Sequence, residues 1–482
     1  MHLLGRADLL LSDAFIAGRW HQAAKRFAVR NPSGNDLLAE VSDCTRSDAA
    51  GAIKAAARAQ PGWAARTGKE RAAILRRWHD LIIAHSDDLA VILTAEMGKP
   101  LAEAKGEILY GASFVEWFAE EAKRVYGETI PGHHNDKRLM VMRQPIGVVG
   151  AITPWNFPNA MITRKVAPAL AAGCAIIVKP AAETPLSALA LARLAQEAGL
   201  PDGVLSVLPS TDAIGIGLEF SENPVVRKIS FTGSTHVGRI LMRQGAAQIK
   251  KLSLELGGNA PFIVFDDADL DAAVEGAIVS KFRNAGQTCV CTNRIYAQDA
   301  IYDRFVGKLT KAVAGLTVGD GFSAGADIGP LISPAALDKV RGHIADAVAH
   351  GAQVLTGGQP HELGGSFFAP TVLRDVTARM AVAREETFGP LAPVFRFSTL
   401  DEVVAAANDT EFGLASYVYS RDLGRVWQMM EQLEYGMVGV NTGLISTEVA
   451  PFGGIKQSGL GREGSRHGIE DYMVMKYCCL SV

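Results

Sequence analysis

Hydrophobic residues change their spacing along this chain, and the change separates two kinds of predicted structure. Up to about residue 127 they recur mainly every three or four positions, which is typical of amphipathic helices. From residue 146 onward, continuous apolar runs alternate with amphipathic segments, as in a parallel sheet that helices cover on both faces. The first part is predicted to hold short strands at 15–20 and 27–29 and helices at 47–60, 67–80, 87–97 and 100–126.

The alternating part contains two successive series of strands and helices, which predicts two sheet domains. In the first series, strands are predicted at 146–153, 176–179, 204–208 and 228–231, and helices at 185–198, 213–220 and 236–244. The second series begins at Phe262, with strands predicted at 295–298, 353–356, 392–397, 416–419 and 437–440, and helices at 301–314, 334–350, 400–408 and 423–434. Outside both sheets, the run 138–145 alternates as an exposed strand does, and the run 472–480 is strand-like.

The predicted fold class is therefore α/β, and it indicates where a ligand site belongs. In a parallel sheet, ligands bind at the carboxyl ends of the strands. Trp155, Lys179 and the pair Gly233–Ser234 each follow a predicted strand of the first series. Because Cys289 lies in the second series, the active site is expected in the cleft between the two domains.

Length and charge exclude several classes of protein. A chain of 482 residues exceeds one ordinary core, so two or three domains are expected. The net charge of −3 argues against a nucleic-acid partner, which needs a clustered basic surface. No apolar run approaches membrane-spanning length, and no signal-cleavage pattern follows the first dozen residues. A cytoplasmic protein without a membrane partner is predicted.

The cysteines do not form a disulfide framework, which fits a reduced compartment. No Cys/His set has the spacing of metal ligands, and the adjacent pair His133–His134 is interpreted as solvated loop, so no metal site is predicted. The six cysteines are Cys44, Cys174, Cys289, Cys291, Cys478 and Cys479.

Three residues are candidates for covalent chemistry. Cys289 lies in a loop between a helical run and a β-type run, and a thiolate there needs a base and a donor for developing negative charge. Glu255 lies between Leu254 and Leu256 at the end of an apolar strand, where desolvation would raise its pKa towards that of a general base. Asn156 offers a side-chain donor for an oxyanion.

Each candidate has a structural role as its alternative. In the alternative interpretation, Cys289 is a packed apolar side chain and Glu255 is an acceptor for loop N–H groups. Asn156 would then be a turn residue. Gly233 and Gly238, five positions apart, do not form the dinucleotide fingerprint and are typical of any turn from strand to helix.

Longer motifs contain these residues: ELGG at 255–258, GQTC at 286–289, FTGS at 231–234 and EETFGP at 385–390. With them the chain resembles the NAD(P)-dependent aldehyde dehydrogenase superfamily from about Phe15 to its C-terminus. The runs 155–165, 281–291 and 441–464 resemble the succinate-semialdehyde branch of that superfamily. The resemblance implies a Rossmann-like cofactor domain at 1–127 and 146–254, a catalytic domain at 255–460, and a small β oligomerisation arm at 128–145 and 461–482. Such an arm implies a homodimer or homotetramer.

The resemblance also implies roles in catalysis. Cys289 attacks the aldehyde carbon, Asn156 and the Cys289 backbone N–H hold the oxyanion, and Glu255 activates the water that hydrolyses the thioester. Glu463 matches a second glutamate that some members use for proton relay, and its alternative is a solvated loop charge. Cys291 is either a packed thiol or a reversible redox partner of Cys289.

For the cofactor, the resemblance places Gly233 and Ser234 at the pyrophosphate, Lys179 at the adenosine ribose and Glu386 at the nicotinamide ribose. The same site is expected to include Trp155, Asn156, Leu256 and Phe388.

Cofactor choice is predicted from the turn after Lys179. NAD-preferring relatives often carry a glutamate at the third position after this lysine, and here that position is Ala182. Alanine leaves room for a 2′-phosphate, with which Lys179 can pair. NADP is therefore the predicted acceptor, with NAD as the weaker alternative, and Glu183 opposes this prediction if the turn is shifted by one residue.

For the substrate, Arg164 and Arg283 are expected near the mouth of the site, and two guanidiniums there indicate an anionic tail. The resemblance implies that these arginines and Ser446 bind the far carboxylate of succinate semialdehyde, a small aldehyde that is oxidised to succinate. The alternative for the arginines is salt bridging at the surface or between domains.

Glutarate semialdehyde is the nearest alternative substrate, since one methylene changes selectivity by only roughly 10–200-fold. A catalytically silent binding protein on this fold and an ester-hydrolysing thiol enzyme are alternatives of other classes.

Overall fold

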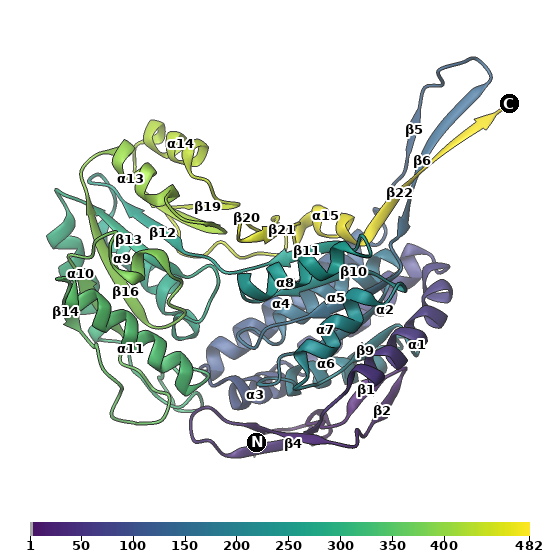
Figure 1. Cartoon of the computed structure of the whole chain (residues 1–482), viewed down its shortest axis with the longest axis horizontal. Coiled ribbons are helices and arrows are strands. Elements are labelled where there is room, and N and C mark those ends of the chain that lie inside the picture. The colour runs from purple at the N-terminus through teal and green to yellow at the C-terminus, as the bar shows by residue number, and fades with distance from the viewer. Residues whose placement is uncertain (1–2) are drawn as a thin grey trace.

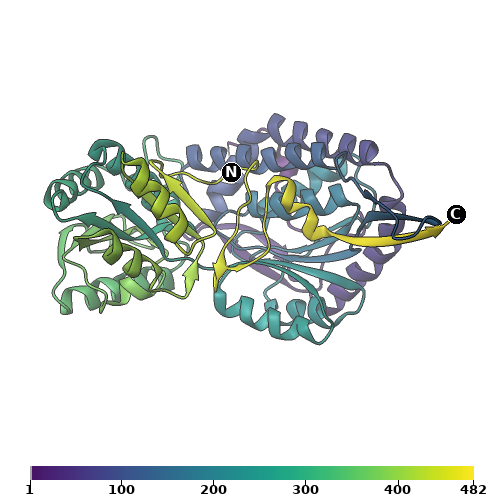
Figure 2. The ribbon, with the colours of Figure 1, turned by 90° about the horizontal axis from the view of Figure 1, so that it is seen from above.

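Two large sheets form the cores of two lobes, and a narrow sheet projects from one lobe (Figure 1). The computed structural model describes residues 3–482. Seen from above, the lobes lie side by side along the long axis, and the C-terminus ends at the tip of the projection (Figure 2). The predicted α/β class is confirmed, because each lobe alternates buried strands with helices.

The sheet of the first lobe has the order β2-β1-β9-β8-β7-β10-β11-β21. Its central strands, from β9 to β11, are parallel, and β2, β1 and β21 join antiparallel at the two ends. The strand bounds are β1 Ala14–Ile16, β2 Arg19–His21, β7 Val148–Ile152, β8 Ala175–Lys179, β9 Leu205–Val207, β10 Val226–Thr232, β11 Lys251–Glu255 and β21 Gly459–Leu460.

Helices cover this sheet, and their start points follow from capping chemistry. Thr45 and Thr67 each cap a helix through a capping box, with Asp48 and Glu70 as the reciprocal acids. The helix α5 is buried along its whole length between the sheet and α4. The bounds are α1 Arg46–Ala64, α2 Gly68–Ala84, α3 Ser86–Met97, α4 Leu101–Glu121, α5 Ala160–Ala172, α6 Leu186–Glu197, α7 Ala213–Glu222 and α8 Thr235–Ala246.

The sheet of the second lobe has the order β14-β15-β16-β13-β12-β18-β19 and is parallel except for β14. The strands are β12 Ala260–Val264, β13 Thr292–Gln298, β14 Gln353–Thr356, β15 Thr371–Arg374, β16 Leu391–Phe397, β18 Ala415–Tyr419 and β19 Met437–Val440. The helices are α9 Leu270–Phe282, α10 Tyr302–Ala314, α11 Pro334–Ala349, α12 Ala381–Arg384, α13 Leu400–Asn408 and α14 Leu423–Gln432.

The projecting sheet consists of β5 Glu128–Ile130, β6 Lys137–Pro145 and β22 Met473–Ser481. The strand β22 pairs antiparallel with the whole of β6, from Met473 beside Pro145 to Ser481 beside Lys137. Of the segment 461–482 that was expected in the arm, residues up to 472 form α15 Ser465–Gly468 and the 3-10 turn Glu470–Tyr472 at the base of the projection.

Smaller pairs complete the fold: β3 Arg26–Arg30 with β4 Leu37–Ser42, and β17 Phe412–Gly413 with β20 Ile455–Lys456. The prediction of one strand at 15–20 is wrong, because this segment is the tight hairpin of β1 and β2. Ala17 and Gly18 both adopt positive φ, as a two-residue hairpin turn requires. Within residues 3–482, no helix is both long enough and apolar enough to cross a membrane.

Candidate active site

The carboxyl ends of the first sheet's parallel strands bring the predicted cofactor residues to one edge. Ile152 of β7 is in register with Lys179 of β8 and Phe231 of β10, and Thr232 is in register with Glu255 of β11. The loops after these residues therefore leave the sheet side by side, as expected for a ligand site at strand ends. They bring Trp155, Asn156, Gly233, Ser234 and Leu256 around one cavity.

The loop that carries Cys289 begins with an unusual backbone. Helix α9 ends at Phe282, and Asn284, Ala285 and Gly286 then adopt left-handed conformations with φ of 54°, 55° and 75°. A left-handed conformation costs a non-glycine residue about 1–2 kcal/mol, so surrounding contacts must hold this turn.

Two contacts hold the turn in place. The Glu103 carboxylate accepts a hydrogen bond from the Asn284 backbone N–H at 2.9 Å. Gly286 packs so closely that a Cβ at this position would lie 2.2 Å from the Gly389 carbonyl oxygen. The turn before the nucleophile is thus fixed by a carboxylate of the first lobe and by close backbone packing in the second.

Two donors for an oxyanion adjoin Cys289. The Asn156 side-chain amide donates one hydrogen to the Gln287 carbonyl at 2.9 Å, which leaves its second hydrogen for a ligand. Among the hydrogen bonds of residues 3–482, none uses the backbone N–H of Cys289. Gly258 of the ELGG motif lies against Cys289, since a Cβ there would be 2.5 Å from the Cys289 carbonyl oxygen.

The candidate base Glu255 is buried, and the candidate nucleophile Cys289 is partly buried. Burial raises the pKa of Cys289 to about 12, and the Arg164 guanidinium opposes this shift. Burial, and then the charge of Glu463, raise the pKa of Glu255 well above its usual value. Neither Glu255 carboxylate oxygen has a hydrogen-bond partner among the described residues. A carboxylate with a raised pKa and free lone pairs fits a general base.

Glu463 is not a solvated loop charge, because it is only 5% exposed. Its carboxylate pairs with Lys165 and, at 2.8 Å, with Arg164. Burial alone would raise the pKa of Glu463, but Lys165 and Arg164 outweigh it and lower the pKa. Glu463 is therefore an ionised neighbour that disfavours a second negative charge on Glu255.

Arg164 does not line the cavity that contains Arg283 and Ser446. Its guanidinium packs 4.0 Å from the centre of the Phe452 ring. Although Nη2 stands 2.8 Å from Glu463, neither Nη2 nor Nε makes a geometrically sound hydrogen bond to any described residue. The charge of Arg164 is thus balanced while some of its N–H groups stay without acceptors.

The central cavity, of about 410 Å³, joins Cys289 and Asn156 to the predicted nicotinamide residues. Trp155 and Phe388 meet edge to face across 5.6 Å at its wall. Glu386 accepts a hydrogen bond from the Gly258 N–H at 3.2 Å, and burial raises the pKa of Glu386 to about 7. Aromatic walls, a carboxylate for ribose hydroxyls and the N-terminus of α8 after Ser234 together fit a nicotinamide dinucleotide.

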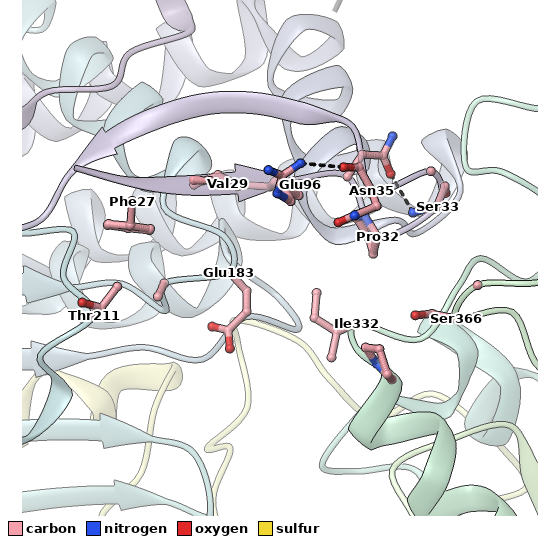
Figure 3. A pocket seen from close by; sticks show the side chains of 17 residues that line it. Phe27, Val29, Pro32, Ser33, Asn35, Glu96, Glu183, Thr211, Ile332 and Ser366 are labelled. Atoms are coloured by element: carbon pink, nitrogen blue, oxygen red, sulfur yellow. Dashed lines mark hydrogen bonds between the residues drawn. The ribbon is translucent and has the colours of Figure 1, made fainter.

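A larger cavity, of about 850 Å³, lies beyond Lys179, between the β3–β4 hairpin and the second lobe. Ala182 and Glu183 line it together with Ile332, and Figure 3 labels Glu183 and Ile332 among the side chains around it. The Lys179 side chain is 5% exposed and donates to the Pro180 carbonyl at 3.1 Å. Burial lowers the pKa of Lys179, and the charge of Glu183 opposes that shift, so the two groups interact.

A third cavity, of about 280 Å³, contains two of the predicted substrate residues, Arg283 and Ser446. Phe157 lines both this cavity and the central one, and the Arg283 guanidinium lies 5.3 Å from the centre of its ring. Within residues 3–482, no carboxylate lies within ion-pairing distance of Arg283. Arg283 is therefore a cation that is available for an anionic ligand.

Several residues at this site were not found from the sequence. Tyr110 lines the third cavity, and its buried hydroxyl has no hydrogen-bond partner among the described residues. Glu103, Glu107 and Tyr110 recur at helical spacing along α4, and Lys99 precedes that helix. A polar stripe on a helix whose other inward positions are apolar is the sequence signal that would have found them.

Cys291 packs in the second lobe with its Sγ 3.2 Å from the Lys281 carbonyl oxygen. This contact fits a packed thiol, and a redox role with Cys289 stays a prediction.

Comparison with known proteins agrees with this geometry. The model of the aldehyde dehydrogenase family matches residues 20–478. The chain is 62% identical to the glutarate-semialdehyde dehydrogenase of Pseudomonas aeruginosa, with 98% of both chains covered. It is 61% identical to the NADP(+) succinate-semialdehyde dehydrogenase of Escherichia coli, over 99% of this chain and 100% of the relative. It is 62% identical to the 3-sulfolactaldehyde dehydrogenase of Pseudomonas putida, with 98% of both covered.

A crystal structure of succinate-semialdehyde dehydrogenase from Burkholderia pseudomallei is 62% identical, covers 100% of both chains and superposes with a TM-score of 0.99. Full-length identity at this level, together with the four motifs around one cavity, establishes the family. The chain belongs to the aldehyde dehydrogenase family.

Proposed function

We propose that this chain oxidises succinate semialdehyde to succinate and reduces NADP. One observation carries the substrate class. Arg283, a cation without a carboxylate partner among the described residues, lines a small cavity that adjoins the Cys289 cavity at Phe157. A short aldehyde with a carboxylate at its far end fits this pairing, because arginine binds carboxylates in a fork.

The catalytic steps follow from the positions of Cys289, Asn156 and Glu255. The Cys289 thiol releases its proton to water, and the charges of Arg164 and Arg283 favour the thiolate. The thiolate attacks the aldehyde carbon, and the Asn156 amide and the Cys289 N–H donate to the oxyanion. Glu386, Trp155 and Phe388 would hold the nicotinamide of NADP, which would supply the hydride acceptor, and loss of hydride from that carbon would leave a thioester on Cys289. Glu255 then takes a proton from water, the hydroxide attacks the thioester, and succinate leaves as the thiolate returns.

NADP is proposed as the acceptor on local charge and on the similarity to an NADP(+)-named relative. Ala182 leaves room beside Lys179 for a 2′-phosphate at the rim of the larger cavity. Glu183 lines the same cavity and would repel that phosphate, so NAD is expected to serve as a weaker acceptor.

Glutarate semialdehyde is the second candidate substrate, because its named dehydrogenase is as similar to this chain as the succinate-semialdehyde enzyme is. The similar 3-sulfolactaldehyde dehydrogenase suggests that a sulfonate tail is also tolerated. All three aldehydes carry an anionic group at the far end, so Arg283 would serve each of them.

The projecting sheet is proposed to join copies of the chain into a homodimer or homotetramer. Its strands expose apolar side chains that no described residue covers, among them Met475 at 70%, Tyr477 at 58% and Ile130 at 42%. An exposed apolar sheet of this kind marks a contact surface.

The test is nicotinamide reduction by the purified protein with succinate semialdehyde, glutarate semialdehyde and acetaldehyde, each with NADP and with NAD. Strong turnover of the carboxylated aldehydes and weak turnover of acetaldehyde is expected. In Arg283→Leu, kcat/KM for the carboxylated aldehydes should fall by roughly 10–100-fold while that for acetaldehyde stays constant. Equal turnover of acetaldehyde by the wild-type protein would contradict the proposed substrate and leave the reaction type standing.

A further inference from the structure

A buried ion pair lies behind the loop that carries Asn156. The Lys99 ammonium donates to the Glu107 carboxylate at 2.7 Å, and each side chain is only 1% exposed. The same ammonium donates to the Asn156 backbone carbonyl at 2.8 Å and lies 3.9 Å from the centre of the Phe157 ring. The ammonium thus has two acceptors and an aromatic ring around it, and Lys99 and Glu107 also line the third cavity.

Glu107 holds the far end of the same loop. One of its oxygens accepts hydrogen bonds from the Asn159 N–H at 2.9 Å and the Ala160 N–H at 3.2 Å, at the start of α5. The pair Lys99–Glu107 therefore holds residues 156–160 at two points. Removing two charges from water costs several kcal/mol per ion, so such a pair is weak evidence for a role in stability.

Hydrogen bonds continue from this loop to the nucleophile loop. The Asn284 side chain donates to the carbonyls of Asn156 at 3.0 Å and Gln287 at 3.2 Å. The Asn156 side chain donates to the Gln287 carbonyl at 2.9 Å, which closes a ring of contacts around the Asn156 amide. A shift of the Asn156 carbonyl would therefore displace the Asn156 amide, whereas the turn before Cys289 is also held by Glu103 and by the packing of Gly286.

We propose that Lys99 and Glu107 are positioning residues that hold the Asn156 amide at the oxyanion site. This inference rests on the proposed role of Asn156 in aldehyde oxidation. The pair does not need to touch the substrate, and it acts through the peptide of Asn156. A misplacement of about 1 Å costs roughly 10²-fold in rate, and loss of an oxyanion donor costs about 10²–10³-fold.

The test compares Lys99→Met, Lys99→Arg and Glu107→Gln with the wild type, using whichever aldehyde the wild type turns over. In Lys99→Met, the rate of the first turnover should fall by roughly 10–100-fold, whereas the KM for NADP and the alkylation rate of Cys289 by iodoacetamide should change less than about 3-fold. Lys99→Arg keeps the charge and should recover part of the rate. The matched control is the exposed pair of Lys105 on α4 with Asp87 on α3, at 2.5 Å, and Lys105→Met should match the wild type.

An unchanged first-turnover rate in Lys99→Met would overturn the inference. A similar loss in Lys105→Met, or a rise in the KM for NADP equal to the fall in rate, would do the same. If Lys99→Met does not fold, Glu107→Gln decides by the same measurements, because glutamine keeps the shape of the side chain. Failure of the proposed substrate appears separately, as a wild-type protein that does not oxidise succinate semialdehyde.

Discussion

Two buried charged clusters adjoin the proposed active site, and they differ in how their carboxylates are bound. Both oxygens of Glu255 lack hydrogen-bond partners among the described residues, and its pKa is raised by burial and by Glu463. Glu107, in contrast, accepts from the Lys99 ammonium and from two backbone N–H groups. Both carboxylates are buried, so burial by itself does not distinguish them.

The difference indicates what each cluster does. A buried carboxylate with free lone pairs and a raised pKa can take a proton from water near neutral pH. A buried carboxylate that accepts from an ammonium and from two backbone N–H groups is suited to holding its neighbours in place. We therefore propose that the first cluster transfers protons and that the second holds the Asn156 loop in place.

The largest effect is expected at Cys289, the proposed nucleophile. Cys289→Ser should lower kcat for aldehyde oxidation by at least about 10³-fold, because a hydroxyl is a far weaker nucleophile than a thiolate. Binding of NADP, measured as the quenching of protein fluorescence, should persist. An active Cys289→Ser protein would show that neither cluster serves a covalent reaction.

Glu255→Gln sharpens the comparison because it removes the carboxylate that has no hydrogen-bond partner. We expect kcat to fall by roughly 10²–10⁴-fold, the range for loss of a general base. In the wild type, kcat should fall as pH falls through the raised pKa of Glu255, because only the ionised carboxylate accepts a proton. In Glu255→Gln that slope should vanish, and a variant that keeps the wild-type pH profile would assign the base elsewhere.

The sequence predicted one half of this comparison and not the other. Glu255 was found because a charge at the end of an apolar strand is conspicuous and lies in a motif. The Lys99–Glu107 pair was not found, because charges on a helix are ordinarily solvated and their burial depends on how α4 packs against α5. The left-handed turn at Asn284 and Ala285 was missed for a related reason, since it is imposed by tertiary contacts and not by local preference.

A substitution at Tyr110 tests whether the comparison extends to the third cavity. There, as at Glu255, a polar group without a hydrogen-bond partner would contact a ligand. Tyr110→Phe removes only the hydroxyl, so kcat/KM for succinate semialdehyde should fall by about 10-fold if the hydroxyl donates to its carboxylate. Turnover of acetaldehyde should not change and serves as the control. An equal loss with both aldehydes would assign Tyr110 to packing.

The smallest effect is expected at Glu183, a carboxylate that lines the larger cavity yet remains exposed. Glu183→Gln should raise the ratio of kcat/KM for NADP over NAD by about 5-fold, because solvent screens its repulsion of a 2′-phosphate. The NADP-to-NAD ratio of kcat/KM is measured for the wild type and for Glu183→Gln, with one aldehyde at a fixed ionic strength. A ratio that falls would show that Glu183 binds the ribose instead of repelling the phosphate.

Rapid mixing with NADP and succinate semialdehyde tests the division between the clusters most directly, because it separates hydride transfer from thioester hydrolysis. Glu255→Gln is expected to form about one reduced nicotinamide per active site at nearly the wild-type rate and then to turn over slowly. Lys99→Met is expected to lose rate in that first turnover. A slow first turnover in Glu255→Gln together with a wild-type first turnover in Lys99→Met would contradict the account.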